Sequence, residues 1–302
     1  DKLINEFQSI YLPEKNYSER TLDEKQIKLK QYRKTWGDLS TSAMTTRDIV
    51  EYLNSLTTNA YIKHRGLLDQ LFQFAIHQGY RDTNPVAATM VKTAPKRTRK
   101  KHTIEGYQAI YDISPDWLQR AMDIALRSLQ RRGDLTRLHR DQIDMQKGTI
   151  RILQRKTRNY PNPVYIEISM GDELRAAVQA SIASGIPCPY LIHYRPQRTT
   201  QKRIYAKDHP FSVTDDTLTK KFSKYRDESG VYSHIPSGEK PTFHDLRGLG
   251  SYLYEKAGFD KNYIRALTGH ASEAMLNHYI KGHEKPLPIV VSADLKFTGK
   301  RG

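Results

Sequence analysis

The chain has 302 residues, of which 49 are Lys or Arg and 33 are Asp or Glu, so its formal net charge is +16. This length allows one or two domains with a substantial core, whereas no apolar run approaches the ~18 residues of a membrane-spanning helix. The single cysteine, Cys188, excludes a disulfide framework and a cysteine-based zinc site. We expect a reducing, cytoplasmic compartment and a positive surface that favours a polyanionic partner, with nucleic acid the leading candidate.

The first ninety residues carry helical patterns. Ser18 or Thr21 can cap a helix that ends near Trp36, a short amphipathic helix begins at Thr46, and a third helix covers residues 61–77. A Thr-Asn-Pro turn then breaks the pattern. These signals predict a small helical domain over the first ninety residues.

A strongly basic stretch follows this domain. Between residues 91 and 102 there are six cationic side chains and no acidic one, namely Lys92, Lys96, Arg97, Arg99, Lys100 and Lys101. Such a run repels itself and packs poorly, so we interpret residues 91–102 as an interdomain linker. An extended cationic segment can follow a phosphate backbone, which makes these six residues candidate DNA contacts. A nuclear-localisation signal is the alternative interpretation.

The pattern changes in residues 103–285. Ser114-Pro115-Asp116 is a strong helix start, with a hydroxyl cap and proline at the first helical position. Two β-rich runs, residues 149–153 and 164–168, flank a proline-containing loop and predict a hairpin. Further helical patterns cover residues 171–183, 215–229, 244–257, 261–267 and 272–281. We predict two domains that are mainly α, the second an α+β domain with a small β-sheet. The tail, residues 286–302, holds a β-prone run, residues 289–291, with nothing local to pair with.

Polar residues with a capacity for phosphate chemistry gather near the C-terminus. His244 and Arg247 are three residues apart and would share one face of a helix; arginine offers a planar fork to two oxygens, and histidine can pass a proton. Gly269 is placed to end a helix, which leaves His270 at the start of the next segment. Tyr279 follows nine residues later, and a phenol becomes a nucleophile only where cations stabilise the phenolate and a base takes its proton.

This order and spacing of His244-x-x-Arg247, Gly269-His270 and Tyr279 resembles the C-terminal signature of the tyrosine recombinases, the phage integrase family. Upstream, residues 130–135 are similar to the family's first-arginine box, where counting back from Asp134 selects Arg131 rather than Arg132. Lys156, in the loop of the predicted hairpin, matches the position of the family's catalytic lysine. Residues 83–87 and 242–247 look particularly like those of lambda-like integrases. Two supporting positions depart from the family pattern, since Ser128-Leu129 replaces a common Thr-Gly and Thr268 a common leucine.

The resemblance implies an organisation for the whole chain. Residues 1–90 would be a helical core-type DNA-binding domain, residues 103–285 the tyrosine recombinase catalytic domain, and residues 286–302 a tail that is a candidate for packing on a neighbouring subunit. Lambda-like integrases carry a further N-terminal domain that binds arm-type sites. Because this chain begins at Asp1 with the helical segment, we expect a core fragment or a naturally shorter relative.

The resemblance also implies a chemistry, DNA cleavage and rejoining through a 3′-phosphotyrosine, without metal or other cofactor. The expected nucleophile is Tyr279, and Arg131 and Arg247 would stabilise the transition state as preorganised cations. The other implied roles are protonation of the leaving oxygen by Lys156, acid–base catalysis by His244, a hydrogen bond to the phosphate from His270, and orientation of Arg131 by Asp134.

The expected function is that of a phage or prophage integrase, which recombines double-stranded attachment sites for integration and excision. We expect a homotetramer on synapsed DNA, working in a bacterial host cell with accessory DNA-bending or excision factors. One alternative is a type IB topoisomerase-like enzyme, which would relax DNA by the same chemistry without matched partner sites. The other is a catalytically inactive DNA-binding regulator, against which the presence of all six expected residue types argues.

Overall fold

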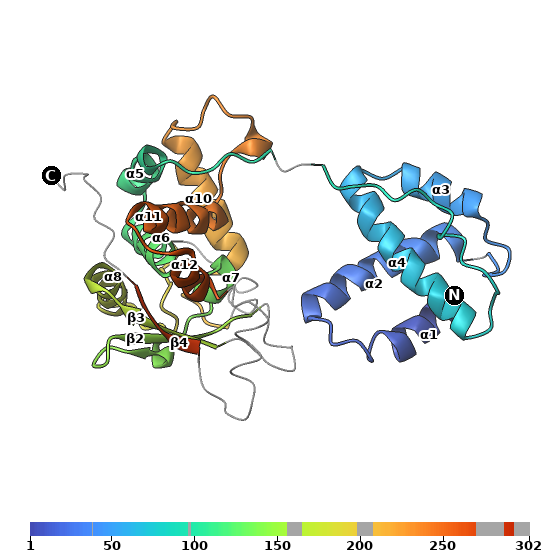
Figure 1. Ribbon diagram of the computed structural model, residues 1–302, viewed down its shortest axis with the longest axis horizontal. Coiled ribbons are helices and arrows are strands. Elements are labelled where there is room, and N and C mark those ends of the chain that lie inside the picture. Colours follow the sequence, from blue (N-terminus) through green and yellow to red (C-terminus); the bar gives the residue numbers. More distant parts are fainter. Residues whose placement is uncertain (38, 96–97, 156–164, 198–207, 270–286, 293–302) are drawn as a thin grey trace. The chain divides into compact units, whose positions relative to one another are not determined.

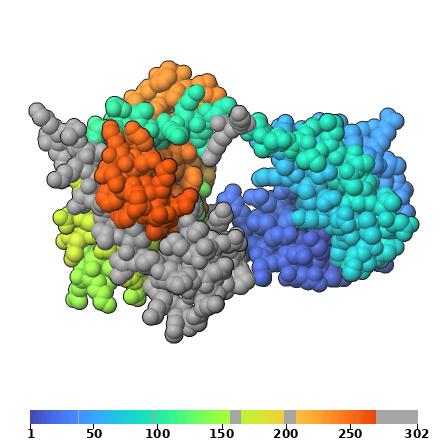
Figure 2. Space-filling view, in the orientation of Figure 1, coloured from blue at the N-terminus to red at the C-terminus, as the bar shows by residue number. Residues whose placement is uncertain are grey.

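The computed structural model describes residues 1–37, 39–95, 98–155, 165–197, 208–269 and 287–292. The chain divides into two compact units, Asp1–Arg97 and Thr98–Gly302. Each has a hydrophobic core of its own. Figure 1 shows the helices of the first unit and the helices and strands of the second, and Figure 2 shows the same view with space-filling atoms. No helix in the described ranges combines the length and the apolar character that crossing a membrane requires.

The first unit is helical, as its sequence predicts. Its elements are α1 (Lys2–Glu6), which continues into the π-helical turn η1 (Phe7–Tyr11), then α2 (Glu19–Trp36), α3 (Thr46–Asn54) and α4 (Thr58–His77). The cap of α2 is Ser18, whose hydroxyl accepts a hydrogen bond from the Thr21 amide at 3.3 Å. Thr45 caps α3 together with Asp48. The fully buried core side chains of this unit include Phe7, Leu29, Ile49, Leu53, Leu68 and Phe72.

The second unit contains most of the predicted helices. Its helical elements are α5 (Ile104–Ile113), α6 (Asp116–Ser128), α7 (Arg132–Leu135), η2 (Arg140–Gln142), α8 (Asp172–Ile182), α10 (Asp215–Glu228), η3 (Ser237–Glu239), η4 (Phe243–Asp245), α11 (Leu246–Lys256) and α12 (Lys261–Thr268). The prediction was wrong at the start of α6, where Pro115 is the cap and Asp116 the first helical residue. Ser114 instead donates to the Ile110 carbonyl at 2.7 Å and so closes α5. The predicted helix over 272–281 lies outside the described residues.

The sheet contains the predicted hairpin and one long-range partner. Its four strands, in the order β1 (Ile143–Asp144), β2 (Thr149–Leu153), β3 (Tyr165–Met170) and β4 (Leu287–Ser292), include two antiparallel pairs. β4 runs parallel to β3. The β-prone run in the tail therefore has a partner in its own chain, far back in the sequence. Packing of the tail on a neighbouring subunit stays a prediction.

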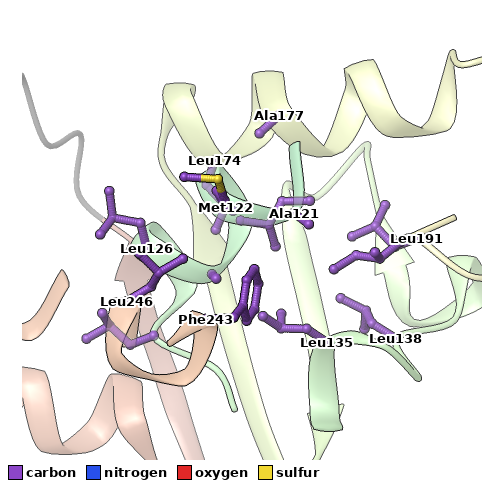
Figure 3. Packing of buried hydrophobic residues seen from close by; sticks show 14 of the residues in the cluster. Ala121, Met122, Leu126, Leu135, Leu138, Leu174, Ala177, Leu191, Phe243 and Leu246 are labelled. Carbon is purple, nitrogen blue, oxygen red and sulfur yellow. The ribbon is translucent and has the colours of Figure 1, made fainter. Parts of the chain in front are cut away.

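Helix α6 organises the core of the second unit. In Figure 3, Met122 of α6 lies beside Leu174 of α8, and Leu126 lies toward Leu246 at the start of α11. At Gly250 of α11 a Cβ would lie 2.5 Å from Leu129 Cδ2 and closer still to the Leu126 carbonyl oxygen, so only glycine allows the two helices to approach this closely. This packing brings the end of α6 against the start of α11.

Candidate active site

The end of α6 presents Arg131 through a turn of unusual backbone. Leu129 follows the helix with φ of 55°, which makes it the one described non-glycine residue in the left-handed region. Such a conformation costs an L-residue roughly 1–2 kcal/mol, so it must be stabilised by its surroundings. The Leu129 side chain is fully buried. The side-chain Nε2 of the neighbouring Gln130 donates to the carbonyls of Ser128 and Leu267 at 2.8 and 2.7 Å. Arg131 is the next residue, at the cap of α7.

Gln154, just beyond the end of β2, connects three distant segments. Its side chain is completely buried. Its Oε1 accepts a hydrogen bond from Arg131 Nη1 at 2.7 Å, while its Nε2 donates to the Thr268 carbonyl at 3.0 Å. Gln154 was not among the residues predicted for the site. The one signal in the sequence that could have identified Gln154 is its place between a β-rich run and the basic pair Arg155-Lys156.

Arg247 meets the same network from the first turn of α11. Its Nη1 donates to the Leu129 carbonyl at 2.7 Å, and its Nη2 donates at 2.8 Å to the Thr268 carbonyl that also accepts from Gln154. Burial, followed by the positive charge of Arg131, lowers the pKa of Arg247 to about 10. The guanidinium therefore stays charged at neutral pH, in a position where an added anion would relieve both effects.

Asp134 lies at the edge of this network and carries a perturbed carboxyl group. Its Oδ1 accepts a hydrogen bond from the Arg155 amide at 2.8 Å. Burial raises the pKa of Asp134, and the Arg155 hydrogen bond together with the charges of Arg131 and Arg247 opposes that rise. Since Gln154 makes the hydrogen bond to Arg131, an orienting effect of Asp134 on Arg131 would act through charge.

His244 and Arg247 lie in two consecutive turns of one helical segment, in which η4 continues directly into α11. His244 is an exposed residue of η4, and α11 begins only at Leu246. The helix predicted from residue 244 begins at Phe243 as η4 and becomes α-helical at Leu246. Thr242 and Asp245 form a capping box at its start, with Asp245 Oδ2 accepting from the Thr242 amide at 2.9 Å and from its hydroxyl at 2.7 Å. The box fixes the turn that carries His244.

The last residues of the predicted linker belong to the second unit. The Lys100 amide donates to the Glu239 carbonyl at 2.7 Å, and Arg99 lies 3.8 Å from Asp245. His102 is buried, with its ring nitrogens 3.2 Å from the Tyr232 hydroxyl and 3.1 Å from the Thr242 carbonyl. Burial lowers the pKa of His102 to about 4. This segment is thus joined to the turn that carries His244.

The remaining cations of the linker are distributed differently. Lys92 belongs to the first unit, where its ammonium lies 4.0 Å from the centre of the Tyr61 ring. Lys100 and Lys101 have exposed side chains. Lys96 and Arg97 lie outside the described residues. Exposure leaves Lys100 and Lys101 accessible to a phosphate backbone.

Three expected site residues, Lys156, His270 and Tyr279, also lie outside the described residues, but two of their neighbours do not. Arg155 precedes Lys156, and its amide is bonded to Asp134. Gly269 precedes His270 and ends α12 in the left-handed conformation, with φ of 67°. Its backbone lies so close to Gln154 that a Cβ there would come within 3.0 Å of the Gln154 side chain. Both chain segments therefore leave the described structure from the network around Arg131 and Arg247.

The comparisons with known proteins agree with this geometry. The model of the phage integrase family matches residues 100–285. The chain belongs to the phage integrase family. The integrase of Escherichia phage HK022 is 30% identical over 282 residues, which cover 89% of this chain and 72% of that protein.

Solved structures of lambda integrase extend the likeness to the fold. A lambda integrase(75-356) dimer bound to a COC′ core site has a TM-score of 0.73 and 26% identity, covering 91% of this chain and 96% of that chain. A lambda integrase tetramer bound to a Holliday junction has the same TM-score and identity, covering 90% and 77%. This phage integrase family member is a site-specific recombinase that breaks and rejoins DNA, and neither the topoisomerase-like nor the inactive alternative is favoured.

Proposed function

We propose that this integrase cleaves double-stranded attachment sites through a covalent link between Tyr279 and a 3′ phosphate. The observation that carries the proposal is the joining of Arg131 and Arg247 by Gln154 and one carbonyl, that of Thr268. Four chain segments converge there, and two guanidinium groups lie close enough for the charge of Arg131 to lower the pKa of Arg247. An anion with several oxygens satisfies such a pair better than water does.

The proposed step is an in-line displacement at phosphorus. The Tyr279 oxygen forms the new bond to phosphorus and the bond to the 5′ oxygen breaks, so one phosphoester replaces another and the 5′-hydroxyl can later reverse the reaction. Arg131 and Arg247 hold the non-bridging oxygens, where charge builds up, and loss of one such preorganised donor costs about 10²–10³ in rate.

Proton transfers complete the step. His244 takes the proton of the tyrosine as the new ester forms, and Lys156 supplies a proton to the leaving 5′ oxygen. His270 donates a hydrogen bond to the phosphate. The exposed position of His244 in a fixed turn supports its role, because a group that handles a proton of the attacking phenol must be accessible from the DNA side.

The DNA assembly follows the same proposal. Residues 1–90 serve as the core-type DNA-binding domain, and the exposed linker cations Lys100 and Lys101 contact the phosphate backbone. Lambda integrase has been solved as a dimer on a core site and as a tetramer on a Holliday junction, which supports a homotetramer on synapsed sites for this chain. Accessory DNA-bending or excision factors would set the direction of recombination.

A nicked suicide duplex that bears the attachment core, taken from the DNA beside the gene, tests the chemistry. The wild-type protein should form a covalent protein–DNA band in the presence of EDTA, and Tyr279→Phe should form none. Tyr252→Phe is the matched control, because Tyr252 is a tyrosine of α11 that is 54% exposed. This variant should cleave like the wild type. A band that persists in Tyr279→Phe contradicts the nucleophile assignment, and complete loss in EDTA contradicts the metal-independent step.

A further inference from the structure

His102 lies in a buried position between the end of the basic linker and the turn that carries His244. Its side chain is 5% exposed, and it takes no part in the proposed chemical step. Its Nε2 lies 3.1 Å from the Thr242 carbonyl oxygen, and its Nδ1 lies 3.2 Å from the Tyr232 hydroxyl. A buried imidazole with both nitrogens paired is held in one orientation. The ring therefore joins the linker to the first residue of the segment 242–247.

The direction of each hydrogen bond around His102 is determined. A carbonyl oxygen only accepts, so Nε2 carries the hydrogen and donates to Thr242. Because burial lowers the pKa of His102 to about 4, the ring is neutral at pH 7 and Nδ1 accepts from the Tyr232 hydroxyl. The Tyr232 oxygen in turn accepts from the Thr103 amide at 3.1 Å. This chain of hydrogen bonds fixes the tautomer of His102.

Aromatic packing adds a second contact between His102 and this segment. The His102 ring meets the Phe222 ring of α10 edge to face, with 5.6 Å between the ring centres, and Phe222 meets Phe243 in the same way at 5.6 Å. Phe243 directly precedes His244 and is 2% exposed. His102 thus holds the Thr242 carbonyl directly and the Phe243 ring through one intervening ring.

The other end of the segment belongs to the network of the site. Arg247 donates to the carbonyls of Leu129 and Thr268 at 2.7 and 2.8 Å. His244 therefore lies between two anchored ends of a short segment, one held by His102 and the other by the site itself. Such anchoring matters for catalysis, because misplacing a catalytic group by about 1 Å can cost on the order of 10²-fold in rate.

We infer that His102 is a positioning residue: through its hydrogen bond to the Thr242 carbonyl it holds the turn that carries His244. This inference rests on the proposed function, in which His244 takes the proton of the attacking tyrosine. Because His102 is buried, it acts through this turn and not on the DNA. Loss of its Nε2 donor should therefore slow the cleavage of bound DNA and leave the affinity for DNA as it is.

Single-turnover cleavage of the nicked suicide duplex, at saturating protein, tests this. His102→Leu removes both ring nitrogens and keeps an apolar side chain in the buried position. It should lower the cleavage rate about tenfold or more, part of the roughly 10²–10⁴ that an acid–base residue supplies. His102→Gln has a side-chain Nε2 that can donate to the Thr242 carbonyl, so it should recover most of the rate. The affinity for the duplex should stay that of the wild type in both variants.

A double-mutant cycle with His244 separates positioning from a general weakening of the fold. In a His244→Ala background, His102→Leu should add no further loss, because the group that it positions is gone. His193→Leu is the matched control: His193 is 2% exposed in the same unit, with Nε2 2.7 Å from the Ser184 hydroxyl and Nδ1 2.8 Å from the Tyr190 carbonyl. It should also destabilise the unit in urea unfolding, but its folded fraction should cleave like the wild type.

The results distinguish failure of this inference from failure of the proposed function. Absence of a covalent band from the wild type, or cleavage by His244→Ala at the wild-type rate, overturns both. If His244→Ala is slow, the positioning role alone is wrong in any of four cases: His102→Leu cleaves like the wild type, it slows His244→Ala further, His102→Gln recovers nothing, or His193→Leu is slowed as much. Should His102→Leu fail to fold, the rate and the cycle are read from Tyr232→Phe, which keeps the ring and removes the hydroxyl that fixes the tautomer.

Discussion

Replacement of Gly269 by alanine would disturb both stability and catalysis. The residue has φ of 67°, where an L-residue costs roughly 1–2 kcal/mol. The new Cβ would lie 2.5 Å from Ile166 Cδ1 and within 3.0 Å of the Gln154 side chain. Gln154 is completely buried and hydrogen-bonded to Arg131 and to the Thr268 carbonyl, so overpacking adds about 1–3 kcal/mol. We expect Gly269→Ala to destabilise the second unit by about 2–5 kcal/mol.

Gly230→Ala is the matched control for the backbone contribution. Gly230 belongs to the same unit and has φ of 69°, but nothing lies within 4 Å of a Cβ built on it. It should lose only the backbone part, about 1–2 kcal/mol. Urea unfolding, followed through the fluorescence of Trp117 in a Trp36→Phe background, measures both.

The catalytic consequence is read from suicide-substrate cleavage by the folded fraction. Displacement of Gln154 would break its hydrogen bond to Arg131, so Gly269→Ala should cleave at least tenfold more slowly than Gly230→Ala. Equal destabilisation of the two variants, or equal cleavage rates, would refute the idea that the end of α12 is fitted to Gln154.

Two further predictions concern stability alone. The pKa of His102 is lowered from 6.5 to about 4, so between those values the unfolded chain binds more protons and stability falls as the pH falls. From pH 7 to pH 5 the loss attributable to His102 should be about 2 kcal/mol in urea unfolding, and His102→Asn should remove that part of the pH dependence. In α11, Gly250→Ala should destabilise by about 1–3 kcal/mol, because its Cβ would meet the Leu126 backbone. Gly248→Ala, on the exposed and open side of the same helix, should stabilise by about 0.5–1 kcal/mol in the same assay; destabilisation of both would contradict the packing argument.

The sequence predicted best those features whose determinants are local. The cap of α2, the start of α3 at Thr46 and the hairpin β2–β3 depend on residues within a few positions of one another, and the structure contains all of them. The partner of β4 could not be predicted, because parallel pairing with β3 joins segments that are far apart in sequence. The capping box at Thr242 was local but was missed, since the histidine motif was read as already helical.

The site shows the same division. The motif residues Arg131, His244 and Arg247 could be chosen from their types and spacing. The amide of Gln154 could not be assigned a role, because its partners are a side chain of α7's cap and a carbonyl at the end of α12.

Residues 99–102 are attached to the second unit by hydrogen bonds and an ion pair. This attachment shortens the stretch of sequence between the contacts made in one unit and those made in the other. Lys92 lies on the Tyr61 ring in the first unit and Arg99 lies beside Asp245 in the second, so the sequence between these two points has six residues, 93–98. At roughly 3.3–3.6 Å per residue, six residues span at most about 20 Å. In the proposed assembly, binding of one unit to a duplex makes binding of the other an intramolecular step, at an effective concentration on the order of millimolar for so short a linker. Weak DNA binding by each unit alone is then compatible with tight DNA binding by the whole protein. Residues inserted between 93 and 98 should weaken DNA binding by the whole protein and leave the affinity of each separate unit unchanged.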